Sequence, residues 1–73
     1  MLKVKDDVDL KILSNFKFEY DDFFGKWYFN DGVCENIRIN HWNRKISIES
    51  TGEGASKILL NLIEENLIEY IDE

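Results

Sequence analysis

Residues 36–48 have the sequence NIRINHWNRKISI, in which apolar and polar side chains alternate on both sides of a four-residue turn. Ile37 and Ile39 alternate with polar residues before the turn, as Ile46 and Ile48 do after it. A period of two is typical of strands that bury one face. The segment therefore predicts a β-hairpin.

The residues before this hairpin are rich in aromatic side chains and predict two further strands. Residues 16–20 alternate aromatic and charged side chains, and the next run places Trp27 and Phe29 on one face and Tyr28 on the other. The sequence DDFFG at residues 21–25 separates the two runs and has turn chemistry. We expect strands at 16–20 and 26–30, joined by this turn.

The start of the chain predicts a short helix over residues 7–14. Val8 and Ile12 are four residues apart, which is helical spacing, and Asn15 is suited to a left-handed stop. Val8, Leu10 and Ile12 also alternate, so a strand is the competing interpretation. The natural stop at Asn15 favours the helix.

An amphipathic helix is predicted over residues 55–65. If it continued to Tyr70, Asn66 would interrupt its apolar stripe and Ile68 would lie on its polar side. Ending the helix at residue 65 makes Asn66 a left-handed cap and residues 67–71 a short strand. This second interpretation removes both conflicts.

Together these elements predict one α+β domain spanning residues 1–73. It consists of a short N-terminal helix, an antiparallel meander of about four strands, the amphipathic helix packed on one face, and a C-terminal strand at a sheet edge. The predicted core consists of Phe16 or Phe18, Trp27, Phe29, Ile37, Ile39, Ile46 and Ile48 from the sheet, and Ile58, Leu59, Leu62 and Ile63 from the helix.

Composition excludes several classes of function. The 73 residues carry 15 Asp and Glu against 9 Lys and Arg, a net charge of −6, which disfavours nucleic acid and anionic membranes as partners. No apolar run is long enough to cross a bilayer, and residues 1–7 do not resemble a signal peptide. One cysteine cannot form an intramolecular disulfide, which fits a cytoplasmic protein.

The sequence predicts no catalytic, metal or cofactor site. Cys34 and His41 are the only thiol and imidazole, and a predicted strand separates them, so they do not form a nucleophile–base pair. The aspartates at positions 6, 7, 9, 21 and 22 suit helix caps and turns and lack the spacing of a calcium loop. Residues 50–57 contain two glycines before a helix but not the phosphate-loop pattern.

The loop of the hairpin is the first candidate contact surface. Trp42 and Arg44 lie in the loop, where Asn43 is available for a positive φ, and Arg38 and Lys45 lie on the adjoining strands. Trp and Arg are frequent in interface hot spots. These side chains predict a patch for a protein partner that presents carboxylates around an apolar pocket. In the competing interpretation Trp42 folds back over the core.

The acidic C-terminal segment is the second candidate surface. Residues 51–73 contain six acids and one base, and Glu64, Glu65, Glu69 and Asp72 would form one acidic surface. Such a surface could be only solvated, or it could imitate nucleic acid and bind a basic protein.

Four stretches of the chain suggest a source. They are DLKxLxNFxFxY at residues 9–20, IRIN at 37–40, RKIxI at 44–48 and LIxxNLIE at 62–69. The pattern resembles small acidic uncharacterised proteins from prophages and mobile elements of AT-rich Gram-positive bacteria. The resemblance implies an accessory or host-interacting protein, and no particular activity or site.

Three functional hypotheses follow. The leading one is a non-enzymatic cytoplasmic protein-interaction module. The second is an acidic inhibitor that imitates nucleic acid and binds a DNA- or RNA-binding protein, which carboxylates over both helices and a sheet edge would favour. The third is a small-molecule-binding domain, which a deep pocket lined by Phe23, Phe24 or Tyr28 would favour.

Overall fold

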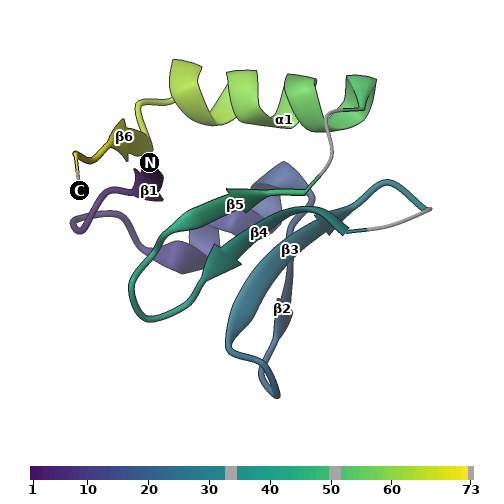
Figure 1. The fold of residues 1–73 in the computed structure, drawn as a ribbon, viewed down its shortest axis with the longest axis horizontal. Helices are drawn as coiled ribbons and strands as arrows, with labels where there is room; N and C mark the ends of the chain where they lie inside the picture. The colour runs from purple at the N-terminus through teal and green to yellow at the C-terminus, as the bar shows by residue number, and fades with distance from the viewer. Residues whose placement is uncertain (33–34, 50–51, 73) are drawn as a thin grey trace.

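The computed structural model describes residues 1–32, 35–49 and 52–72 and has an α+β architecture (Figure 1). A four-stranded antiparallel sheet has the order β2-β3-β4-β5, and a separate two-stranded sheet pairs β1 with β6. The strands are β1 (Leu2–Val4), β2 (Glu19–Asp21), β3 (Lys26–Asn30), β4 (Glu35–Asn40), β5 (Ile46–Ile48) and β6 (Ile68–Tyr70). The helices are the 3-10 helix η1 (Leu10–Phe16) and the α-helix α1 (Glu53–Glu64).

The meander confirms the prediction made from residues 26–30 and 36–48. Trp27 lies opposite Ile39, and Ile39 lies opposite Ile46, so the apolar side chains of three neighbouring strands share one face. The first strand of the meander, β2, is shorter than predicted and begins at Glu19, because η1 extends through Phe16.

The N-terminal helix forms, but as a 3-10 helix that begins and ends later than predicted. Asp9 caps it by accepting a hydrogen bond from the Lys11 N–H. The left-handed residue is Lys17, with φ 69°, and not Asn15, which lies inside the helix. The reversal at Lys17 brings the next residue, Phe18, into the core, where it is 3% exposed. Burial of Phe18 therefore accounts for the position of the stop.

The end of α1 confirms the predicted cap and the strand after it. Asn66 has φ 58°, and its N–H and that of Leu67 donate to the carbonyls of Ile63 and Leu62. The following strand, β6, does not join the meander. It pairs with β1, which the sequence pattern had not indicated, so the two chain ends lie side by side (Figure 1).

The core lies between the inner face of the meander, α1, η1 and the β1–β6 pair. Two predicted members are exposed instead: Ile48 is 41% exposed and Ile63 is 57% exposed. Ile63 is about 100° around the helix from the buried Leu62, and the buried stripe of α1 is too narrow to include both. The side chains that complete the core from outside the predicted set are Val4, Leu10, Leu13, Ala55, Leu67 and Ile68.

Arg44 connects the hairpin loop to the N-terminal segment. It adopts the left-handed conformation, with φ 65°, that the sequence had suggested for Asn43. Its Nη1 donates to the carbonyl oxygens of Lys5 and Val8, and its own carbonyl accepts from the Val4 N–H at 2.9 Å. Arg44 is thus part of the tertiary structure of the chain.

The Leu62→Ala substitution tests the core assignment. Leu62 is fully buried in the stripe of α1, so truncation should lower the free energy of unfolding by about 2–5 kcal/mol. Chemical denaturation followed by circular dichroism measures this change. Leu60→Ala, at a position that is 53% exposed on the same helix, is the control and should change stability little. Equal effects of the two substitutions would contradict the assignment.

Candidate functional site

The turns of the two hairpins lie next to each other at one end of the meander. The His41 N–H, at the start of the second turn, donates to the carbonyl of Gly25 in the first turn at 2.9 Å. Phe23 and Phe24 from the first turn and Trp42 from the second form an exposed surface, which we call the aromatic tip. The two turns are neighbours because one precedes β3, the other follows β4, and these two strands pair with each other.

The three rings of the aromatic tip are far more exposed than large apolar side chains usually are. Phe23 is 84%, Phe24 is 65% and Trp42 is 72% exposed. The two phenyl rings pack edge to face, with centroids 4.8 Å apart. Large apolar side chains that are exposed together on adjacent turns are a candidate interaction surface.

The backbone of the first turn holds the two phenylalanines outward. Asp21 Oδ1 accepts hydrogen bonds from the N–H groups of Phe23 at 3.0 Å and Phe24 at 3.2 Å. An aspartate that bonds the backbone two and three residues further on fixes a tight turn. The turn therefore closes on itself without burying either ring.

Glycine at position 25 permits the indole of Trp42 to lie against the backbone of the first turn. A Cβ atom at Gly25 would lie 2.0 Å from Cη2 of Trp42, closer than any real contact. Gly25 also has φ 63°, a conformation that favours glycine. In the second turn, Asn40 Oδ1 accepts from the N–H groups of Trp42 and Asn43, at 2.8 and 3.0 Å. Trp42 is thus positioned by both turns.

Further aromatic side chains connect the tip to the core. The Trp27 indole N–H donates to His41 Nδ1 at 3.2 Å, which places the proton of a neutral His41 ring on Nε2. The Tyr20 ring lies 4.9 Å from that of Trp27 and 5.1 Å from that of His41. The His41 ring packs edge to face with that of Trp42, and Trp27 is 8% exposed, so this cluster connects Trp42 to the core.

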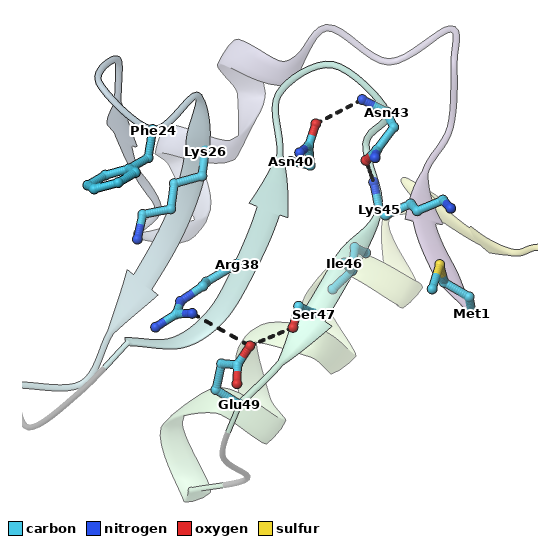
Figure 2. Close-up of a pocket in the computed structure, with 10 residues that line it drawn as sticks. All are labelled: Met1, Phe24, Lys26, Arg38, Asn40, Asn43, Lys45, Ile46, Ser47 and Glu49. Atoms are coloured by element: carbon cyan, nitrogen blue, oxygen red, sulfur yellow. Dashed lines mark hydrogen bonds and ion pairs between the residues drawn. The ribbon is translucent and has the colours of Figure 1, made fainter.

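An open groove of about 470 Å³ lies beside Phe24 on the outer face of the meander (Figure 2). It is lined by Met1, Phe24, Lys26, Arg38, Asn40, Asn43, Lys45, Ile46, Ser47 and Glu49. The small-molecule hypothesis expected a pocket lined by Phe23, Phe24 or Tyr28, and of these three residues only Phe24 lines the groove.

Two cations that line the groove are paired with carboxylates. Lys26 Nζ donates to both carboxylate oxygens of Glu35, at 2.9 and 2.8 Å, and Arg38 Nε donates to Oε2 at 2.9 Å. The hydrogen bond from Lys26 is the largest cause that holds the pKa of the Glu35 carboxyl below its ordinary value. Arg38 also lies 3.7 Å from Glu49, which accepts from the Ser47 hydroxyl at 2.6 Å.

The structure separates the four residues of the patch predicted around the hairpin loop. Trp42 lies in the aromatic tip, Arg38 and Lys45 line the groove, and the guanidinium of Arg44 bonds the N-terminal segment. The exposed position of Trp42 rules out its alternative role as a lid on the core. Sequence reasoning did not assign Phe23 and Phe24 to the site, although two aromatic residues inside a turn sequence were a signal.

The predicted acidic surface consists of exposed side chains on α1, β6 and the residues beside them. Glu64, Glu65, Glu69 and Asp72 are all exposed, and among the described residues their carboxylates have no hydrogen bond or ion pair. No carboxylate lies on η1, so the acidic surface covers one helix and not both.

Some of the residues considered for catalysis and for anion binding lie outside the described ranges. Cys34 and residues 50–51 lie outside the described residues, so the structure does not describe the thiol–imidazole pair or all of the loop before α1. Within residues 1–32, 35–49 and 52–72, no three His, Cys, Asp or Glu side chains gather as a metal site would require. No helix in the same ranges has the length and apolar character needed to span a bilayer.

Comparison with known proteins gives no relative. No family model matches the chain, and neither a curated protein nor a solved structure matches it. The aromatic tip is therefore interpreted from its own geometry.

The Gly25→Ala substitution tests how the tip is built. The added methyl group should displace the Trp42 indole, because it would overlap the ring, and the Trp42 indole N–H signal should shift in an NMR spectrum. Gly32→Ala is the matched control, because Gly32 also has a positive φ, 102°, but nothing within 4 Å of the added atom. Both changes strain the backbone, and only the first should move Trp42. An unchanged Trp42 signal in Gly25→Ala would contradict the packing described here.

Proposed function

We propose that this protein is a non-enzymatic protein-interaction module that binds its partner through the aromatic tip. The observation that carries the proposal is the exposure of Phe23, Phe24 and Trp42 on adjacent turns. Tryptophan is among the residues most enriched in interface hot spots, and a partner that covered these rings would remove a large apolar area from water.

The contacts that hold the exposed rings in place favour a role in binding. The side-chain oxygens of Asp21 and Asn40 accept hydrogen bonds from backbone N–H groups and so fix both turns. Gly25, which has no side chain, leaves room for the Trp42 ring against the backbone. Side chains that are already held in place lose less conformational entropy when a partner covers them. A preorganised apolar surface is therefore a better candidate for recognition than the same rings on a loose loop.

The polar groups of the groove support the non-enzymatic part of the proposal. Lys26 and Arg38 share the carboxylate of Glu35, and Ser47 donates to Glu49. Catalysis needs acid, base or nucleophilic groups that converge on a reacting atom. In the described part of the chain these groups satisfy one another, which is typical of a stabilising surface network.

The second candidate function is an acidic inhibitor of a DNA- or RNA-binding protein. The exposed carboxylates of α1 and β6, which have no partners among the described residues, favour it. Lys11 on η1 and the lack of a carboxylate on that helix count against a continuous imitation of a phosphate backbone. A source among small proteins of prophages and mobile elements would fit either function. We propose that binding takes place in the cytoplasm, which the single cysteine supports.

Affinity capture from the native host, followed by mass spectrometry, would supply a partner for a direct test. Trp42→Ala should weaken binding of that partner by about 2 kcal/mol, or roughly thirtyfold, measured by isothermal titration calorimetry. The melting temperature should change little, because Trp42 is 72% exposed.

The double substitution Glu64→Gln, Glu65→Gln is the control for this experiment. It removes charge from the acidic surface and leaves the aromatic tip intact, so the proposal expects nearly unchanged affinity. Loss of binding in this control with full binding by Trp42→Ala would exclude the aromatic tip and favour the acidic inhibitor.

A further inference from the structure

Most of the lysine and arginine side chains in the described part of the chain form hydrogen bonds or ion pairs with other residues of the protein. Lys3 pairs with Asp6, and Lys5 donates to Asn66 Oδ1, each at 2.7 Å. Lys26 and Arg38 bond Glu35, and Arg44 bonds backbone carbonyls. Lys11, Lys17 and Lys57 have no such partner in the part of the chain that the structure describes, and they lie outside both turns of the aromatic tip.

Seven carboxylates of the described residues, by contrast, remain available at the surface. Those without a hydrogen bond or ion pair among the described residues are Asp7, Asp22, Glu53, Glu64, Glu65, Glu69 and Asp72. The net charge of −6 is therefore presented to an approaching partner largely by these exposed carboxylates. A surface of this sign attracts basic partners at long range.

The aromatic tip also has a negative charge close to its rings. Asp22 is exposed and directly precedes Phe23, and Lys26, beside Phe24, is held by two hydrogen bonds to Glu35. Lys26 Nζ also lies 5.4 Å from the centroid of the Phe24 ring. The chain itself thus shows that the face of Phe24 accepts a cation.

We propose that the partner of the aromatic tip presents a basic segment, with arginine or lysine side chains beside apolar ones. A guanidinium or ammonium group would stack on the exposed faces of Trp42 or Phe23 and pair with the carboxylate of Asp22. Tryptophan is the ring that binds cations most strongly, and arginine is the cation most often found over it. This inference rests on the proposed function and specifies its partner.

The inference reverses the sign of the charge that the sequence pattern suggested for the partner. That expectation depended on Arg44 and Arg38 as free cations beside Trp42. Arg44 directs its guanidinium to two backbone carbonyls of the N-terminal segment, and Arg38 bonds Glu35, so both guanidinium groups are engaged away from Trp42. In the described part of the two turns, Asp22 is a carboxylate that has no hydrogen bond or ion pair.

Selection of random twelve-residue peptides displayed on phage tests the inference. The wild-type protein is immobilised as bait, and clones that also bind the double variant Phe23→Ala, Trp42→Ala are removed. Both positions are exposed, so the variant should keep the fold, which circular dichroism verifies. The inference expects the remaining peptides to be enriched in arginine or lysine together with apolar residues.

The other outcomes separate this inference from the proposed function. Peptides that depend on the tip but are acidic or uncharged would overturn the basic partner and leave the aromatic tip as a binding site. A selection that yields no peptide dependent on the tip would overturn both.

A charge substitution then tests the role of Asp22 with one selected peptide. Asp22→Asn should weaken binding about threefold at low salt, and the difference should shrink as salt screens the pair. Glu65→Gln makes the same change in net charge far along the sequence and should have a smaller effect. Equal effects of the two substitutions, or none from Asp22→Asn, would contradict direct pairing at Asp22.

Discussion

The guanidinium of Arg44 lies against two backbone carbonyls of the N-terminal segment, and the arrangement of the two sheets depends on this contact. Nη1 donates to the carbonyls of Lys5 and Val8, while the backbone carbonyl of Arg44 accepts from Val4. Lys45, the next residue, forms a β-bridge with Lys3. The hairpin loop of the meander is therefore tied to β1, and through β1 to β6 and the C-terminal end of the chain.

The loop that carries Arg44 also carries Trp42 of the aromatic tip. The loop reverses within four residues, with Arg44 in the left-handed conformation, and Trp42 then lies against Gly25 of the neighbouring turn. Arg44 packs toward the N-terminal segment while Trp42 remains 72% exposed. Two residues of one loop thus have different roles: Arg44 stabilises the tertiary structure, and Trp42 is exposed as part of a candidate binding surface.

The success of sequence reasoning varied with the range of the interactions involved. Strand alternation and the cap at Asn66 are local features, so the second hairpin and the end of α1 were predicted correctly. β1 was missed because its three residues carry one buried side chain and its partner strand lies at the other end of the chain. Nothing local indicates that Arg44 bonds distant carbonyls, because this contact depends on tertiary packing. The two aromatic residues in the turn at 21–25 were a local signal for an exposed site, and it was not used.

The most direct test of this account is the effect of Arg44→Asn on stability. Asparagine adopts the left-handed conformation readily, so the substitution removes the guanidinium contacts without adding backbone strain. The free energy of unfolding, measured by chemical denaturation, should fall by about 2 kcal/mol, as for lost hydrogen bonds to a charged group. Amide hydrogen exchange should accelerate first in β1 and β6. Unchanged stability and exchange, with loss of partner binding alone, would show that Arg44 is a contact residue and contradict the account.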